Sequence, residues 1–259
     1  MPFIFEARDG IHIIDLAKTK EGLEEAAKYL KNLAKTPSAT LLVVGTKRQA
    51  DELLLTEIER VKKEIKGDSG LFFVTNKWIG GLLTNFSEVS KNFKKLTDFT
   101  HKLATPSEQE GFTKKEIGGW QKESHKLENL YGGVAKITKK PDALFIIDSH
   151  LEDLVVREAL ATHVPTVAIV DTNADPAVVD YPIPANDDAV GSISLIVNYI
   201  IDSWIEGRKE GAKQKEISDK TEEVKKVSKE AASAKSSGEP KEKAAKKETK
   251  SKTKKTKKS

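Results

Sequence analysis

Four short runs of nearly continuous hydrophobic residues predict strands. They are Ala39–Gly45 (ATLLVVG), Leu71–Val74 (LFFV), Asp142–Asp148 (DALFIID) and Thr166–Asp171 (TVAIVD). Runs that do not alternate with polar residues are typical of parallel strands covered on both faces. Weaker strand candidates lie near His12–Ile14 and at Tyr181–Ile183. The pattern therefore predicts a mainly parallel sheet.

Hydrophobic residues in the intervening segments recur every three or four positions, as they do on one face of a helix. These stripes occupy residues 23–33, 50–65 and 190–204. Thr46 with Gln49, and Ser149 with Glu152, predict capping boxes directly after two of the strands. The succession of strand, cap and helix predicts an α/β domain with helices packed on a parallel sheet.

Residues 84–135 interrupt this succession, because they contain two helical stripes and no convincing strand. The turn-like sequence TPSEQEGF separates the stripes, and Thr113 with Glu116 predicts a third capping box. We therefore expect an inserted antiparallel helical hairpin, with Phe93 and Leu96 buried between helices. The α/β domain is then built from residues 1–83 and 136–206.

The net charge of +4 hides opposite charges in two parts of the chain. Residues 207–259 contain 19 Lys and Arg against nine Asp and Glu, whereas residues 1–206 contain 25 basic and 31 acidic residues. The folded part is mildly acidic, so any nucleic-acid contact there must come from local patches. Residues 207–259 have little to bury and predict a Lys-rich disordered tail, whose natural partner is a polyanion.

Composition and motifs exclude several classes of protein. The chain has no cysteine, so it has neither a disulfide framework nor a thiolate metal site. No signal peptide is visible, and the most apolar helix candidate, Ser192–Ile205, is interrupted by Asn198 and Asp202. It falls short of the roughly 20 apolar residues that a membrane span needs. We expect a soluble cytoplasmic protein.

The first candidate site is the turn GTKR, which follows a buried strand and opens a helix. Free amide groups at a helix start, together with the cations Lys47 and Arg48, favour a bound phosphate. The turn lacks the extra glycines of a nucleotide-binding loop. The alternative is an ordinary strand-to-helix turn with solvated side chains.

The second candidate site is the segment NKWIGGLLTN, which follows the next strand and combines a cation, an aromatic ring, two glycines and two amides. Lys and Trp can contact the phosphate, sugar or base of a nucleic acid. Paired glycines permit a close approach of the backbone. The alternative is a tight turn capped by Asn85, with Trp78 packed in the core.

Acidic residues follow the later strands and could hold Mg²⁺. The weak candidates are Asp171, Asp175, Asp187 and Asp188. Turn and helix-cap roles explain the same residues better. Asp148, Ser149 and His150 are the residue types of a catalytic triad, but adjacency in sequence does not provide its spatial arrangement. No pair of histidines has the HExxH spacing of a zinc site.

Seven stretches in a fixed order span about residues 2–206. They read PFIFEARDGIHIIDLAKT, LLVVGTKRQA, NKWIGGLLTN, KLENLYGGV, PDALFIID, VAIVDTNADP and IPANDDA. Each stretch alone has little specificity. The ordered set resembles the ribosomal protein S2 family of the bacterial small ribosomal subunit.

The resemblance implies a flavodoxin-like parallel sheet with a protruding helical hairpin and no catalysis. It implies a structural constituent of the small ribosomal subunit that binds small-subunit rRNA, with no cofactor beyond Mg²⁺ associated with that RNA. It also implies neighbouring ribosomal proteins as partners, including the largest one of the small subunit, and no membrane or small-molecule substrate. By motif, the RNA-facing residues would be Lys47, Arg48, Asn76, Lys77, Trp78, Gly80, Gly81, Thr84 and Asn85.

The chain departs from the family's pattern. Family members usually carry a further segment rich in His, Gly and Trp before the PFIF stretch, which here begins at Pro2. Lys77 stands where Arg is usual, which removes bidentate phosphate recognition there, and the Lys-rich tail is atypical. A nucleotide-binding or enzymatic module also fits on a flavodoxin-like sheet. The absence of a recognisable phosphate loop, nucleophile or metal triad in the sequence favours the ribosomal interpretation.

Overall fold

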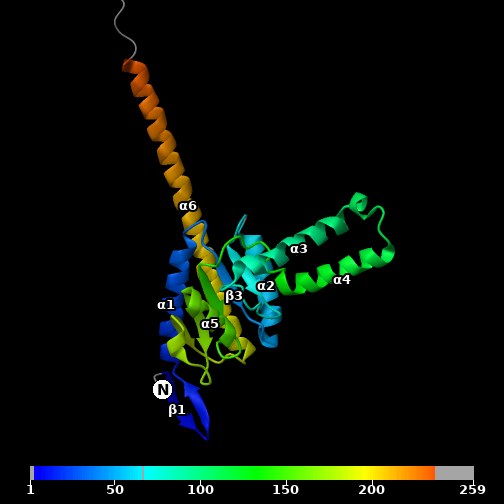
Figure 1. Ribbon diagram of the computed structural model, residues 1–259. Helices are drawn as coiled ribbons and strands as arrows, with labels where there is room; N and C mark the ends of the chain where they lie inside the picture. The colour runs from blue at the N-terminus through cyan, green and yellow to red at the C-terminus, as the bar shows by residue number, and fades with distance from the viewer. Residues whose placement is uncertain (1–2, 66, 237–259) are drawn as a thin grey trace, which may run out of the picture. The chain divides into compact units, whose positions relative to one another are not determined.

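The computed structural model describes residues 3–65 and 67–236, and Figure 1 shows its helices and strands. The strands are β1 (Ile4–Arg8), β2 (Ile11–Ile14), β3 (Leu41–Val44), β4 (Leu71–Val74), β5 (Ala143–Ile146), β6 (Thr166–Val170) and β7 (Tyr181–Pro184). The α-helices are α1 (Leu16–Ala34), α2 (Arg48–Glu64), α3 (Phe86–Ala104), α4 (Lys114–Tyr131), α5 (Asp153–Thr162) and α6 (Val190–Ser236). Short 3₁₀ helices occur at η1 (Pro106–Gln109) and η2 (Pro176–Val178).

Strands β3 to β7 form one parallel sheet in the order β4-β3-β5-β6-β7. Val44 at the end of β3 pairs with Val74 of β4 on one side and with Ile146 of β5 on the other. The carboxyl ends of the strands therefore meet at one edge. An order in which the first strand lies between the second and the third is that of flavodoxin-like folds. The predicted fold is confirmed, and the weak candidate Tyr181–Ile183 belongs to β7 at the sheet's edge.

Alternate residues of the strands face two hydrophobic clusters, one on each side of the sheet. Leu41 and Val43 of β3 pack in the cluster formed with α1, α2 and the first part of α6. Leu42 and Val44 belong to the other cluster, with α5 and the base of the hairpin. All residues of β3, β5 and β6 are buried. Because both faces are covered, these strands have no polar alternation.

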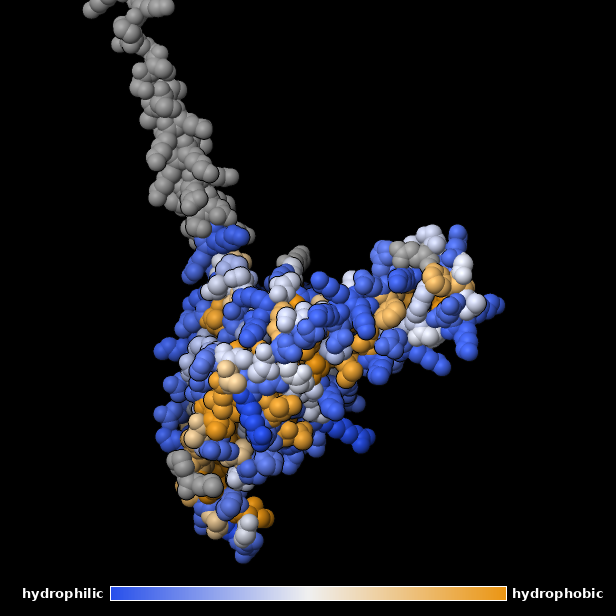
Figure 2. Space-filling model, viewed as in Figure 1, coloured by the Kyte–Doolittle hydropathy of each residue, from blue (hydrophilic) through white to orange (hydrophobic). Residues whose placement is uncertain are grey.

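Helices α3 and α4 form the predicted antiparallel hairpin, which extends away from the sheet (Figure 1). Phe93 and Leu96 are buried as expected, and the ring of Phe93 meets that of Tyr131 edge to face at 5.6 Å between centroids. Thr113 and Glu116 form the predicted capping box of α4. Hydrophilic side chains cover much of the hairpin's visible surface (Figure 2). Phe93 and Tyr131 thus belong to the apolar seam between the two helices of the hairpin.

The other two predicted capping boxes are wrong. Lys47 is the N-cap of α2 and makes no side-chain cap, while the hydroxyl of Thr46 donates to the carboxylate of Glu152. The hydroxyl of Ser149 donates to the backbone oxygen of Ile169 at 3.1 Å. Both hydroxyls are directed toward partners distant in the sequence, so their oxygens do not accept from the N–H groups at the helix starts.

The disordered tail expected from residue 207 differs from the structure at its beginning. Helix α6 continues to Ser236, and residues 237–259 lie outside the described part of the chain. Arg208 is buried and donates to backbone oxygens in the loops before β3 and β4. Sequences rich in Ala, Glu and Lys have high helix propensity even without a hydrophobic stripe. The absence of a stripe therefore did not mean the absence of a helix.

Strands β1 and β2 form a two-stranded antiparallel ribbon, of which the sequence predicted only β2. Four of the five residues of β1 are exposed, so the strand has no buried face that a hydrophobic pattern could reveal. Within residues 3–65 and 67–236, no helix is both long and apolar enough to cross a membrane.

Candidate nucleic-acid interface

The carboxyl edge of the sheet carries opposite charges on its two halves. We call the loops after β3 and β4 the basic half (residues 45–48 and 75–85), because they contain Lys47, Arg48 and Lys77. We call the loops after β5, β6 and β7 the acidic half (residues 147–150, 171–175 and 185–189). Since β3 and β4 are neighbours, the candidate sequences GTKR and NKWIGGLLTN lie together in the basic half.

Lys47 belongs to the basic half, but its side chain forms ion pairs with carboxylates of the acidic half. Its ammonium nitrogen lies 2.8 Å from Oδ2 of Asp148, 2.7 Å from Oδ1 of Asp187 and 2.7 Å from Oδ1 of Asp188. It also donates to the backbone oxygen of Asp187 at 3.0 Å, and 16% of its side chain is exposed. An ammonium group has three donors, and here all of them have protein acceptors. The structure therefore does not support the prediction that Lys47 contacts RNA.

Burial and ion pairing act in opposite directions on this cluster. Burial lowers the pKa of Lys47, but hydrogen bonds to the three Asp carboxylates outweigh it and hold the pKa above its ordinary value. Burial raises the pKa of Asp148, and hydrogen bonds from Lys47 and two backbone N–H groups bring it below its ordinary value. The pKa of Asp187 is raised, chiefly by burial and despite Lys47. Lys47 is therefore a structural cation that pairs with three carboxylates of the acidic half and offsets part of their charge.

Arg48 and Lys77 have the opposite environment. Both side chains are exposed, and neither forms a hydrogen bond or ion pair with the described part of the chain. Arg48 is the first residue of α2, where the free N–H groups of the helix start add positive potential. Lys77 follows β4, the strand beside β3. Two exposed cations therefore lie at the carboxyl ends of neighbouring strands, on one edge of the sheet.

A buried carboxylate that the sequence analysis missed holds the second candidate segment. Glu158 of α5 is 6% exposed and accepts hydrogen bonds from four residues of that segment. The donors are Nε1 of Trp78 at 3.2 Å, the backbone N of Gly81 at 2.7 Å, of Leu83 at 3.1 Å and of Thr84 at 3.3 Å, and Oγ1 of Thr84 at 3.2 Å. Burial raises the pKa of Glu158, but these bonds outweigh it and hold the pKa below its ordinary value. The segment is thus folded around an internal anion.

The spacing of apolar residues in α5 could have identified Glu158 as a charged residue on a buried helix face. Val155 and Ala159 of α5 are buried, and Glu158 lies on the same face, three residues from one and next to the other. A charged residue on a buried stripe needs hydrogen-bonding partners, because its isolated burial is costly. Its presence in the sequence REALAT therefore indicated a polar contact, although not which segment provides it.

The nine predicted RNA-facing residues fall into two groups. Six are exposed: Arg48, Asn76, Lys77, Gly80, Thr84 and Asn85. Lys47, Trp78 and Gly81 are at least partly covered by the protein. Trp78 is 7% exposed and packs in the cluster beneath α5, so the alternative interpretation of Trp78 as a core residue is correct. Its ring is not available to stack on a base.

The backbone requires glycine at only one of the two glycine positions of the segment. Gly81 has a φ of +88°, a left-handed conformation that residues with a side chain rarely adopt. Gly80 has no such φ, and a Cβ added there would come no closer than 3.7 Å to Leu154. The predicted need for glycine is therefore confirmed at Gly81 by backbone conformation. At Gly80 the protein itself imposes no such need.

The weak metal candidates form bonds within the protein. Lys47 pairs with Asp187 and Asp188. Oδ1 of Asp171 accepts from the backbone N of the next residue at 2.6 Å, and Oδ1 of Asp175 accepts from the N of Ala177 at 2.9 Å. Among the described residues, no group of three or more His, Cys, Asp or Glu could hold a metal ion. Turn and capping roles, the alternative interpretation, account for Asp171 and Asp175.

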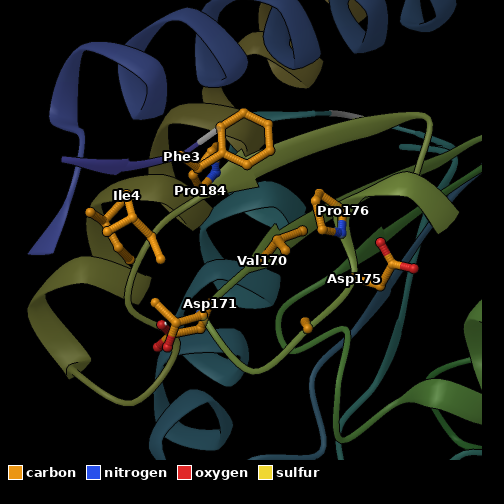
Figure 3. A pocket seen from close by; sticks show the side chains of 10 residues that line it. Phe3, Ile4, Val170, Asp171, Asp175, Pro176 and Pro184 are labelled. Carbon is orange, nitrogen blue, oxygen red and sulfur yellow. Dashed lines mark hydrogen bonds between the residues drawn. The ribbon is translucent and has the colours of Figure 1, made fainter. Parts of the chain in front are cut away.

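An apolar pocket of about 250 Å³ opens beside the acidic half (Figure 3). Phe3 and Ile4 line it from the N-terminal ribbon, and Val170 lines it from the end of β6. Asp171 and Asp175 are the charged residues of its lining, and each already accepts a backbone hydrogen bond. The pocket therefore presents no arrangement of groups suited to acid–base or nucleophilic catalysis.

These features define a flavodoxin-like α/β protein with an inserted hairpin and a cationic surface suited to binding. The sequence signature of the family Ribosomal protein S2 matches residues 1–207. The small ribosomal subunit protein uS2 of Corynebacterium jeikeium (strain K411) is 41% identical, over 84% of this chain and 76% of that protein. The protein of the same name from Petrotoga mobilis (strain DSM 10674 / SJ95) is 44% identical, over 80% of this chain and 68% of that protein. The chain belongs to the ribosomal protein S2 family, and its role is that of a structural ribosomal protein, not an enzyme.

Proposed function

We propose that the chain takes its place in the small ribosomal subunit by setting the basic half of its sheet edge against the phosphate backbone of small-subunit rRNA. The observation that carries the proposal is the pair of exposed cations, Arg48 and Lys77, at the ends of adjacent strands. Each such cation can displace a counterion from RNA. Because residues 1–206 are acidic overall, a local cationic patch is needed for this contact.

A neutral side chain near Lys77 supports the same surface. Asn85 is exposed, and amide groups commonly contact phosphate and sugar oxygens, whereas the hydroxyl of Thr84 already donates to Glu158. The amide of Asn85 makes no capping bond at the start of α3, so it is available to a ligand. Asn76 is different, because its amide donates to the backbone oxygen of Asn129 at 2.7 Å. Asn76 therefore ties the segment to α4 and is a weaker candidate for RNA contact.

We further infer that neighbouring small-subunit proteins, including the largest one, contact apolar surface of this chain. Phe5 and Leu16 are 72% and 78% exposed, and exposed apolar patches often mark protein contacts. Replacing Phe5 with Ser should reduce cross-linking to such a neighbour while rRNA binding persists. The proposal involves no resident cofactor, since Mg²⁺ would come with the RNA, and it places the protein on ribosomes in the cytoplasm.

The test is incorporation of a double variant into small subunits. Arg48→Gln with Lys77→Gln removes both exposed charges, and we expect binding to small subunits depleted of this protein to weaken by roughly tenfold. The melting temperature should stay nearly unchanged, because exposed substitutions usually alter the free energy of unfolding by no more than about 0.5 kcal/mol. Sedimentation of tagged protein with small subunits measures incorporation.

The matched control is Lys62→Gln with Lys63→Gln. These lysines are also exposed and lie in the last turn of α2, the helix that Arg48 begins. The control also removes two positive charges, but from the other end of α2, so incorporation into small subunits should be retained. Equal loss of incorporation in both double variants would show a general charge effect, and retention in both would refute the proposed surface.

A further inference from the structure

The carboxylate of Glu158 occupies the inner side of residues 78–84, where donors from that segment converge on it. Three of the donors are the backbone N–H groups of Gly81, Leu83 and Thr84. Backbone N–H groups that converge on one point are the arrangement by which proteins bind phosphate and other anions. Here the anion comes from the protein's own helix α5.

Because of these hydrogen bonds, residues 78–84 have an inner side that faces Glu158 and an outer side that does not. The convergent N–H groups are satisfied by Glu158, so an RNA phosphate has no access to them. The exposed residues Lys77 and Asn85 directly precede and follow residues 78–84 in the chain. Their place on the surface depends on the backbone that Glu158 holds, including Gly81, whose N–H makes the shortest of these bonds at 2.7 Å.

We infer that Glu158 is a positioning residue for RNA binding, an internal substitute for a phosphate around which the loop folds so that Lys77 is held toward the RNA. The inference rests on the proposed function, and it assigns the role to a residue that does not itself touch RNA, since Glu158 is 6% exposed. The converging donors also stabilise the negative charge of the carboxylate on the side away from solvent, which weakens its repulsion of a phosphate placed near Lys77.

The hydrogen bonds keep this internal anion charged under ordinary conditions. They hold the pKa of Glu158 below its ordinary value although burial raises it. A neutral amide in its place would have a single acceptor oxygen and would turn N–H donors toward the backbone N–H groups of the loop. Glu158→Gln should therefore loosen residues 78–84 while it preserves the size of the side chain.

A double-mutant cycle tests the inference, with full-length protein and small-subunit particles depleted of it. In the parent chain, Lys77→Gln should weaken binding on the order of fivefold. In the Glu158→Gln background, the same change should weaken binding by less than about twofold, because a displaced Lys77 no longer contributes. Arg48→Gln should have its full effect in both backgrounds, since Arg48 begins α2 and does not belong to the segment that Glu158 holds.

Asp142→Asn is the matched control for a general loss of stability. Oδ2 of Asp142 accepts from the backbone N of Thr40 at 2.7 Å and from its hydroxyl at 2.9 Å, at the opposite edge of the sheet. This variant changes a partly buried carboxylate that also accepts hydrogen bonds, and the effect of Lys77→Gln should remain complete in it. If Glu158→Gln does not fold, Trp78→Phe keeps an aromatic ring in the core while it removes the indole donor to Glu158, and it should reduce the effect of Lys77→Gln by a smaller factor.

The outcomes separate this inference from the proposed function. A Lys77→Gln effect that is undiminished in folded Glu158→Gln or Trp78→Phe protein overturns the inference and leaves the basic half intact. An equal reduction in Asp142→Asn would show that stability alone is responsible, which also overturns it. If Lys77→Gln and Arg48→Gln have no effect in the parent chain, the proposed surface fails, and the inference fails with it.

Discussion

The two halves of the sheet's carboxyl edge are both built from loops that follow parallel strands, but they use their charges differently. In the acidic half, the carboxylates of Asp148 and Asp187 are buried and are paired within the fold with Lys47. In the basic half, Arg48 and Lys77 are exposed and have no partner in the described part of the chain. A charge is therefore available to RNA only where the fold has not already neutralised it.

Lys47 and Arg48 show the same difference in adjacent residues. Lys47 is the N-cap of α2, with the extended backbone angles φ −67° and ψ 135°, and its side chain reaches the ends of β5 and β7. Arg48 begins the helix and is exposed. One step along the chain thus separates a structural cation from a candidate RNA contact, which residue type alone could not reveal.

The largest expected effect is that of Lys47→Met on stability. The change keeps the length of the side chain but leaves the buried carboxylates of Asp148 and Asp187 without their cation. Removing one partner of a buried ion pair typically costs 3–5 kcal/mol, and the partial exposure here favours about 3 kcal/mol. Urea unfolding measures the change. Arg48→Gln should change the free energy of unfolding by no more than about 0.5 kcal/mol. If Lys47→Met costs as little as that, Lys47 is not a structural cation.

The pH dependence of that cost follows from the carboxylates. In the parent chain the pKa of Asp148 lies below its ordinary value, so its stabilising contribution is present above the unfolded pKa of about 3.9 and is lost as pH falls. Without Lys47, burial should raise the pKa of the same group, and folding then gains stability as pH falls. The difference in unfolding free energy between the parent chain and Lys47→Met should therefore narrow from about pH 7 to about pH 4. A difference that widens on acidification would contradict this assignment.

A smaller effect is expected inside the basic half, from its two glycines. Gly81→Ala forces a side chain into the left-handed region and should cost roughly 1–2 kcal/mol of unfolding free energy. Gly80→Ala should change stability by less than about 0.5 kcal/mol, because a Cβ there meets only ordinary contact with Leu154. Thermal unfolding distinguishes the two variants. Equal costs would show that the φ of Gly81 does not determine the conformation of the segment.

Much of the fold could be predicted because burial on both faces leaves a strong pattern. The runs of β3, β5 and β6 are continuous in the sequence for the same reason that they are buried in the structure. The hairpin was predictable because Phe93 and Leu96 repeat at helical spacing along its seam. Strand β1 was missed because it is mostly exposed and buries no stripe.

Less of the site could be predicted, because its contacts join residues far apart in the sequence. The sequence identified the segments that contain Arg48 and Lys77, and the pairing of β3 with β4 brings them to one edge of the sheet. It could not show that Lys47 meets Asp187, or that Glu158 lies under Gly81, since both contacts depend on how helices cross the sheet. Two capping boxes failed for the same reason, because tertiary partners competed for Thr46 and Ser149.

The salt dependence of RNA binding tests most directly whether the exposed cations of the basic half contact rRNA. The measurement is the binding constant of full-length protein for small-subunit rRNA as a function of salt concentration. Each lost phosphate contact should reduce the slope of log affinity against log salt by about 1, so Arg48→Gln with Lys77→Gln should reduce it by about 2. Lys62→Gln with Lys63→Gln should leave the slope at the parent value. Equal slopes for the parent and the Arg48 and Lys77 double variant would contradict the account.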